Sequence, residues 1–160
     1  MRAKKLAGVI LGTIIMAEAG ILIFGYVQRQ HDKDFTCVAN LSQHYSDESY
    51  NVSLNYMIRG DSGVINMTGR SEENPDRIFN RKISFNLQRK GDLYYMVSEK
   101  NIKLPDDNFK DEAVSQYEPN FFITAGKEIY MRIVKQRNDS FLMMVDSIPT
   151  YMCNNITGEK

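Results

Sequence analysis

The sequence predicts a mainly β protein, in which a single N-terminal transmembrane helix precedes a small antiparallel β-barrel or sandwich with one short helix. Two observations lead to this expectation. Residues 6–27 are almost continuously apolar, and several later segments alternate apolar and polar side chains as half-buried strands do. A chain of 160 residues has room for one domain and a short appendage. We therefore divide it into a cytoplasmic tail (1–5), a membrane helix (6–27), a linker (28–34) and an exported β domain (35–155).

The apolar segment 6–27 is long enough to cross a bilayer, because a helix rises about 1.5 Å per residue and the hydrocarbon core is about 30 Å thick. The preceding residues MRAKK are basic. Basic flanks stay in the cytoplasm, so the rest of the chain should lie outside. A cleaved signal peptide is the alternative, since the tripeptide AEA at 17–19 fits a cleavage site. The apolar run continues beyond it, which favours an uncleaved anchor.

Three residues of this segment are candidate contacts to another membrane helix. Gly8 and Gly12 form a G-x-x-x-G motif, which lets two helices approach closely. Glu18 would lie near the middle of the bilayer, where a carboxylate costs roughly 2.5 kcal/mol or more unless it is protonated or paired. A hydrogen bond to a partner helix and a neutral Glu18 in a very apolar helix are both consistent with the sequence.

The exported part reads as a series of strands joined by hairpin turns. The clearest alternation covers 50–58, and glycine-containing turns follow it at 60–63 and, later, at 90–92. Seven or eight antiparallel strands at this spacing are typical of a small barrel or sandwich. The predicted strands are 35–41, 50–58, 64–70, 79–87, 93–98, 121–125, 128–136 and 141–145.

One segment breaks the alternation. Residues 106–116, DDNFKDEAVSQ, follow a proline and carry acidic residues early, as the start of a helix does. Phe109, Ala113 and Val114 would form its buried stripe. We expect this helix to cover one end or one edge of the β domain.

The two cysteines, Cys37 and Cys153, lie near the two ends of the exported part. In an oxidising compartment such a pair favours a disulfide, which would bring the first and last elements of the domain together. Two separate buried thiols or a metal pair are the alternatives. A zinc site would need further closely spaced Cys or His ligands, and the sequence has none.

Composition and motifs argue against several functions. The chain has 20 basic and 20 acidic residues, whereas a nucleic-acid-binding protein usually has a basic excess. The only histidines are His31 and His44, and no motif of a hydrolase, metalloprotease or P-loop is present. The paired acids at 72–73, 106–107 and 111–112 are expected to be solvated rather than catalytic or calcium-binding. We therefore predict a protein that is not an enzyme and has no cofactor.

The inward positions of the predicted strands are rich in aromatic residues. A closed barrel of about eight strands can hold one apolar ligand, although such side chains more often fill the core. The candidates for lining an apolar cavity are Tyr50, Tyr56, Phe85, Tyr95 and Phe121.

The MRAKK start, one anchor beginning at Leu6, an exported β domain of this size and a cysteine at each of its ends resemble the FidL-like inner-membrane proteins of enteric bacteria. The layout is also similar to ToxS-type and VtrC-type accessory proteins, which have one membrane helix and a lipocalin-like periplasmic domain. The resemblance implies a bacterial inner-membrane location and association with a ToxR-like transcription regulator. It also implies, for some such pairs, a bile-salt-like ligand in the barrel.

These observations lead to one expected function and two alternatives. We expect a non-enzymatic accessory partner of another membrane protein, anchored in membrane lipid, with its β domain in the periplasm. A periplasmic binder of an apolar small molecule is the first alternative, and a periplasmic enzyme is a more remote one.

Overall fold

The structure is a computed structural model that describes residues 15–25, 34–44, 48–115, 118–145 and 148–157. The chain divides into two compact units, Met1–Asp34 and Phe35–Lys160. In the first unit, residues 15–25 are helical, and Glu18 is an exposed member of this helix. Gly8 and Gly12 lie outside the described residues. In the part of the chain that the structure describes, no helix has the length and apolarity that a membrane crossing requires.

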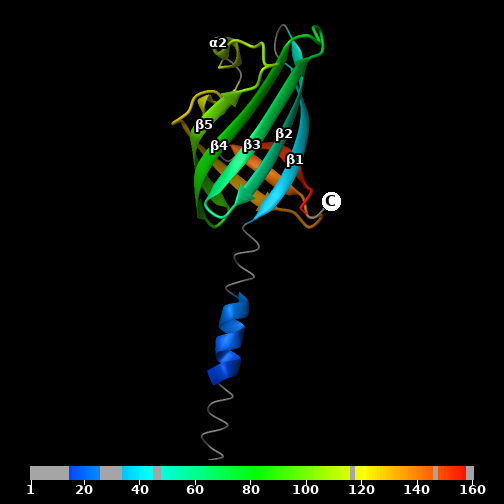
Figure 1. Ribbon diagram of the computed structural model, residues 1–160. Coiled ribbons are helices and arrows are strands. Elements are labelled where there is room, and N and C mark those ends of the chain that lie inside the picture. Colours follow the sequence, from blue (N-terminus) through cyan, green and yellow to red (C-terminus); the bar gives the residue numbers. More distant parts are fainter. Residues whose placement is uncertain (1–14, 26–33, 45–47, 116–117, 146–147, 158–160) are drawn as a thin grey trace, which may run out of the picture. The chain divides into compact units, whose positions relative to one another are not determined.

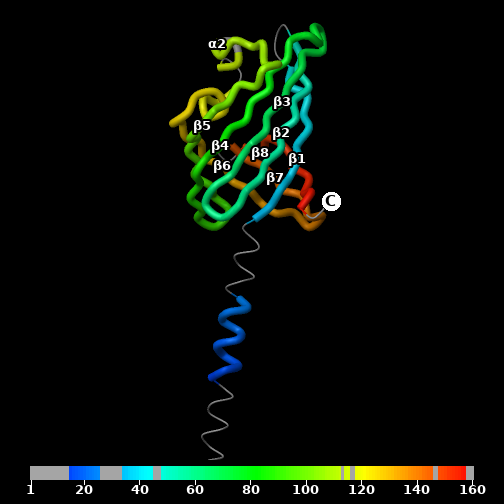
Figure 2. Tube along the Cα trace, in the orientation of Figure 1, coloured from blue at the N-terminus to red at the C-terminus, as the bar shows by residue number. Residues whose placement is uncertain are grey.

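The second unit is a closed barrel of eight antiparallel strands, in which each strand pairs with its neighbours in sequence and β8 returns to β1 (Figure 1). This confirms the predicted mainly β fold and selects the barrel over the sandwich. In Figure 2, β6–β8 run behind β1–β5. The strands are β1 (Phe35–His44), β2 (Ser49–Arg59), β3 (Ser62–Ser71), β4 (Ile78–Lys90), β5 (Leu93–Lys103), β6 (Glu128–Lys135), β7 (Phe141–Val145) and β8 (Ile148–Asn155).

The strand alternation predicted from the sequence matches the burial of the side chains. In β2 every second residue from Tyr50 to Ile58 is buried, and the residues between them are exposed or half-buried. The β2–β3 and β4–β5 hairpins turn through Gly60 and Gly91, which have φ values of 55° and 66°. Two-residue hairpin loops need such positive φ values, and glycine adopts them without steric cost.

Two segments differ from the prediction. The segment 121–125 is not a strand: Asn120–Phe122 form a short 3₁₀ helix, η1, and three consecutive apolar side chains from Phe121 to Ile123 are buried. A strand would turn every second side chain outward, so a run of consecutive buried residues fits a plug against the core better. The strand β8 was not predicted, because Pro149 and several polar residues obscure its alternation.

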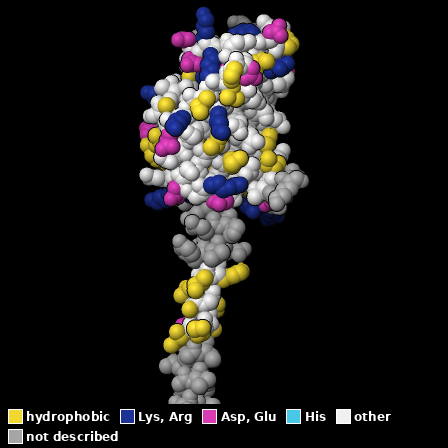
Figure 3. Space-filling model, in the orientation of Figure 1, with side chains coloured by type: hydrophobic (Ala, Val, Ile, Leu, Met, Phe, Trp, Pro, Cys, Tyr) yellow, Lys and Arg dark blue, Asp and Glu magenta, His cyan; other side chains and the backbone are white. Residues whose placement is uncertain are grey.

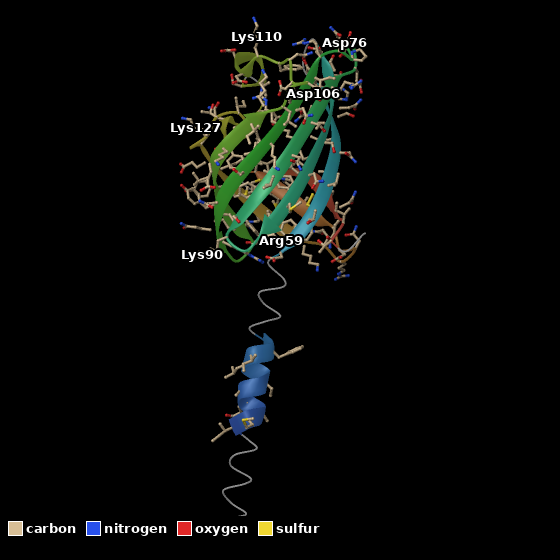
Figure 4. The ribbon with its side chains drawn as sticks, viewed as in Figure 1. Arg59, Asp76, Lys90, Asp106, Lys110 and Lys127 are labelled. Carbon is tan, nitrogen blue, oxygen red and sulfur yellow. A yellow bond between two sulfur atoms is a disulfide. The ribbon has the colours of Figure 1, made fainter. Side chains whose placement is uncertain are left out.

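The predicted helix is much shorter than expected. Only Asp111–Val114 form a helix, α2, within the predicted range 106–116. Phe109 and Val114 are nevertheless buried, as the predicted stripe requires. In Figure 4, Asp106 and Lys110 lie at the upper end of the barrel, opposite Arg59 and Lys90 at the lower end. The segment therefore covers one end of the barrel, mostly without helical structure.

Side chains from all eight strands meet in the barrel interior. Several of the largest are at most 2% exposed, and methionines are frequent among them. These residues are Tyr56, Met67, Phe85, Met96, Met131 and Met143. Two glycines make room for neighbouring rings. A Cβ atom added at Gly69 would lie 2.0 Å from the ring of Phe79, and one at Gly63 would lie 2.3 Å from the ring of Phe85. The interior is therefore closely packed around these rings.

Candidate functional site at the seam between the first and last strands

The barrel closes through a short ladder between β1 and β8. Only two residue pairs are in register, Cys37 with Asn155 and Val38 with Asn154, and the N–H of Ile156 donates to the carbonyl of Thr36 at 2.9 Å. By contrast, β1 pairs with β2 along its whole length. Beyond the short ladder lie residues 39–44 of β1 and 148–152 of β8, and we call this line between the two strands the seam.

The seam leaves main-chain groups of β1 without a strand partner. Successive residues of a strand direct their N–H and C=O groups to alternate sides. Because the carbonyl of Thr36 faces β8, the main-chain groups of Asn40 and Ser42 face the same side. Within the described residues the ladder with β8 ends at Val38, so no β8 residue pairs with Asn40 or Ser42. On the opposite side of the seam, Pro149 has no N–H to donate.

Side-chain hydrogen bonds connect the seam in place of the missing ladder. The hydroxyl groups of Tyr56 in β2 and Tyr151 in β8 are hydrogen-bonded to each other. The side-chain amide of Gln43 in β1 donates to the carboxylate of Glu118 at 2.8 Å, and Glu118 belongs to the segment between α2 and η1. Four side chains from four parts of the chain thus meet along the inner side of the seam.

The electrostatics of this cluster follow from its burial. Burial raises the pKa of the Glu118 carboxyl, and the hydrogen bond from Gln43 opposes the rise. Burial also raises the pKa of both hydroxyls, Tyr56 and Tyr151, and the nearby charge of Glu118 adds to this effect. The tyrosines therefore stay neutral at physiological pH, and Glu118 is the member of the cluster whose charge responds to mild acid.

The disulfide lies at the end of the seam where the ladder begins. The sulfur atoms of Cys37 and Cys153 are 2.00 Å apart and the Cα atoms are 5.4 Å apart, which confirms the predicted bond. Both residues are completely buried. The bond connects β1 to β8, so the first and last strands touch, as the sequence analysis expected.

The outer surface differs on the two sides of the seam. On the β8 side, Ile148 and Met152 are 68% and 43% exposed, and Met152 is paired with the half-buried Leu142 of β7. On the β1 side, the outward residues Asn40 and Ser42 are polar. Elsewhere, basic and acidic side chains are interspersed on the face that Figure 3 shows, and neither sign forms a continuous patch.

Four of the five residues predicted to line a cavity point into the barrel. Tyr50, Tyr56, Phe85 and Phe121 are at most 4% exposed. The rings of Phe85 and Phe121 are 5.8 Å apart in the core, whereas the hydroxyls of Tyr56 and Tyr50 are hydrogen-bonded to Tyr151 and Glu48. The apolar ligand stays a prediction.

The fifth residue, Tyr95, was placed on the wrong face. It lies on the outside of the barrel, where its ring packs 4.8 Å from that of Tyr130 and its hydroxyl donates to Glu128. Both phases of the sequence LYYMV are apolar, so alternation alone could not decide between them. In the structure Tyr94 and Met96 occupy the inward positions.

The sequence analysis did not predict a buried ion pair beneath segment 106–116, which covers one end of the barrel and is called the cap below. Arg81 of β4 and Asp107 are both buried, and the Nε of Arg81 donates to Asp107 at 3.0 Å. Asp107 also accepts the N–H groups of Asn80 and Phe109, each at 3.0 Å, so it fixes the cap to β4. The expectation that Asp107 is solvated was therefore wrong. Its signal was Arg81 itself, which falls on the inward phase of its strand and needs a buried acid.

Asp111, Glu73 and His44 have structural partners. Asp111 lies 2.8 Å from Arg81, Glu73 accepts the N–H of Ser49, and His44 is hydrogen-bonded to the hydroxyl of Ser49. His31 lies outside the described residues. Over the part of the chain that the structure describes, no three Asp, Glu, His or Cys side chains are grouped so that they could hold a metal ion. The absence of enzymatic activity stays a prediction.

Comparison with known proteins gives one family. The model of the YqeJ C-terminal domain matches residues 34–153. No curated protein matches the chain. The matched range begins one residue before β1 and ends at Cys153, so it includes both cysteines and nearly the whole barrel. Through this domain, the chain belongs to the YqeJ C-terminal domain family.

Proposed function

We propose that the barrel is a non-enzymatic accessory domain that binds another membrane protein through the seam. The observation that carries this proposal is the two-pair ladder between β1 and β8, beyond which the main-chain groups of Asn40 and Ser42 have no strand partner within the described part of β8. An exposed strand edge accepts a further strand through main-chain hydrogen bonds. A closed barrel normally has no unpaired strand edge. The unpaired edge of β1 beside the disulfide therefore favours a docking role.

The side chains around the seam support the same role. A strand added along β1 would place one row of its side chains beside Ile148 and Met152, which are exposed apolar residues on the other side of the seam. Clusters of exposed apolar side chains are typical of protein interaction sites. A partner strand with apolar residues at alternate positions would fit this surface best.

The proposal includes a membrane anchor at residues 6–27, with the N-terminus in the cytoplasm and the barrel in the periplasm of a bacterial cell. Its support is the apolar sequence and the basic MRAKK flank. Membrane lipid would surround this helix. Gly8, Gly12 and Glu18 would then be available to contact a partner helix in the bilayer.

The proposed partner is a ToxR-like transmembrane regulator. The support for this choice is the resemblance in layout to ToxS-type and VtrC-type accessory proteins. Family membership covers the barrel, and it leaves the choice of partner to experiment.

Site-specific photocrosslinking tests the docking site. A photoreactive benzoylphenylalanine at Ser42, beside the seam, should yield a crosslinked product with one other membrane protein in cells that carry this chain naturally. The same residue at Asn66, an exposed outward position of β3, is the matched control and should yield none. Equal crosslinking at Ser42 and Asn66 would remove the seam from the proposal.

A fusion experiment tests the topology separately. Alkaline phosphatase joined after Lys160 should be active, because this enzyme folds only outside the cytoplasm. An inactive phosphatase together with an active cytosolic reporter at the same position would reverse the proposed orientation.

A further inference from the structure

A second surface feature begins at the β1 side of the seam, where it includes Asn40 and Ser42, and extends away from it across the outside of the barrel. A groove of about 590 Å³ crosses the outer face of β1, β2, β3 and β4. This face is turned toward the viewer in Figure 1. The volume lies within the range of about 300–1,000 Å³ that is usual for binding sites of small molecules.

The register of the four strands arranges the groove's side chains in two parallel rows. One row runs directly across the sheet, one residue from each strand: Asn40, Ser53, Thr68 and Asn80. The other row is its neighbour two residues along each strand, and it begins with Ser42, Asn51 and Arg70. Adjacent side chains in a row are about 4.8 Å apart, because this is the distance between neighbouring strands.

The floor of the groove is main chain. Between the two rows, the residues turn their side chains toward the core, as Leu41 and Val52 do, and Gly69 has only a hydrogen atom there. The rows themselves are about 6.6 Å apart, which is the length of two strand residues. The groove is therefore a shallow trough with mostly short polar walls, and Ile78 adds an apolar side chain at the β4 end of the second row.

The hydrogen-bonding groups in the trough are mostly uncharged. Hydroxyl and amide groups both donate and accept, so each can pair with a ligand hydroxyl. Ser42 donates to the side-chain oxygen of Asn51 at 2.8 Å, which leaves the NH₂ of Asn51 available as a donor. Such a neutral surface is poorly suited to a polyphosphate or to an apolar ligand. It suits a molecule with a regular series of hydroxyl groups.

The trough contains two charged residues. Asp106 lies at its β4 end, where both carboxylate oxygens are 3.0 Å from the side-chain nitrogen of Asn80. Arg70 lies near the middle, and among the described residues it forms no ion pair. A guanidinium group with no ion-pair partner among the described residues is suited to a ligand carboxylate.

We propose that this trough binds a linear glycan that carries carboxylate groups. Its length runs across four strands, and the spacing of about 4.8 Å between side chains is close to the length of one sugar unit in an extended chain. The hydroxyls of consecutive sugars would thus meet consecutive strands. Arg70 would pair with a sugar carboxylate, so that an acidic glycan binds more tightly than a neutral one.

Saturation-transfer NMR on the full chain in detergent tests the proposal with two probes, tetragalacturonate and the neutral chitotetraose. Both should receive saturation, and tetragalacturonate should bind about tenfold more tightly, because a charge-assisted hydrogen bond adds this much or more. Thr68→Tyr, which fills the trough, should abolish binding of both probes. Asn66→Tyr, two residues away on the same strand but outside the trough, is the matched control and should leave binding unchanged.

A second variant tests the role of the charge. Arg70→Gln should bring the affinity for tetragalacturonate down to that for chitotetraose without affecting the latter. Circular dichroism would show that each variant retains the β spectrum. The proposal fails if neither glycan receives saturation, if Thr68→Tyr binds as the wild type does, or if an extended tetraserine peptide binds in place of both glycans.

Discussion

Removing the disulfide should weaken the barrel strongly, because the bond lies beside the shortest ladder in the sheet. The perturbation is the double variant Cys37→Ala/Cys153→Ala. The bond closes a loop of 116 positions, and the entropy of closing such a loop in the unfolded chain corresponds to about 4.8 kcal/mol at 25 °C. For a barrel of this size the melting temperature should fall by roughly 15–20 °C.

The assay is urea unfolding of the full chain in detergent, followed by near-ultraviolet circular dichroism. The chain contains no tryptophan and nine tyrosines, and Tyr56 is completely buried in the core, so the tyrosine signal reports packing. The oxidised wild type, the reduced wild type and the double variant should be compared. Reduced wild type and variant should lose similar stability, because both lack the covalent link and differ little in packing.

The comparison separates two explanations. A double variant within about 1 kcal/mol of the oxidised protein would show that the short ladder and the hydrogen bonds of the seam hold the barrel closed by themselves. If the double variant loses much stability and the reduced wild type loses none, the effect comes from packing around the sulfur atoms and not from the covalent link.

Three further variants test individual contacts. Glu118→Gln should raise the free energy of unfolding at pH 7 and leave it unchanged at pH 4. The pKa of Glu118 is raised above its ordinary value of 4.5 in the folded protein, so the folded state holds more protons than the unfolded state. The stability of the wild type therefore falls as the pH rises from 4.5 through the pKa of the folded state. Asp107→Ala should cost about 3 kcal/mol in urea unfolding, since it leaves the buried Arg81 with only a partly exposed acid beside it. Gly69→Ala should cost about 1–3 kcal/mol, because its Cβ would overlap the ring of Phe79.

Each of these variants has a matched control. Glu112 is an exposed acid, so Glu112→Gln should change the free energy of unfolding by less than about 0.5 kcal/mol. Asp106 is adjacent to Asp107 but exposed, and Asp106→Ala should cost less than about 1 kcal/mol. Adding Phe79→Leu to Gly69→Ala should recover part of the lost stability. A double variant as unstable as the sum of the two single ones would contradict the proposed overlap.

The sequence predicted best those strands in which one set of alternate residues is apolar and the other set is polar. In β2 the residues from Tyr50 to Ile58 alternate without exception, and the structure places every apolar residue of this phase inside. In β5 both phases are apolar, and Tyr95 was placed inside when Tyr94 is the inward residue. Alternation specifies a face only where the two phases differ in polarity.

The predicted number of strands, seven or eight, agrees with the eight observed, but one predicted strand is not a strand and one observed strand was not predicted. The apolar segment 121–125 was taken as a strand but forms η1 and packs as a plug, while β8 was overlooked. Consecutive residues of η1 are buried because they pack against strands β5 and β6 of the barrel. This packing is a tertiary contact, and the local sequence pattern does not reveal it. β8 depends on its pairing with β7 and β1, and this tertiary context outweighs its poor intrinsic preference for strands.

The seam could be anticipated only in part. Cys37 and Cys153 predicted that the first and last elements of the domain meet, and the disulfide confirms this. The length of the ladder between them, and the meeting of Gln43, Glu118, Tyr56 and Tyr151 beside it, arise from three-dimensional closure. Residues so distant in sequence show no common pattern, so their cluster could be found only in the structure.

The pairing order of the strands also dictates a sequence of events during folding. Seven of the eight ladders join consecutive strands, so each can form as soon as its second strand is available to pair. The eighth joins β1 to β8, and β1 must wait for almost the entire domain before its second neighbour exists. Formation of the Cys37–Cys153 disulfide, in which an external thiol oxidant takes two electrons and two protons from the two thiols, should therefore be the final step of maturation. A chain truncated before β8 would keep a free thiol on its first strand.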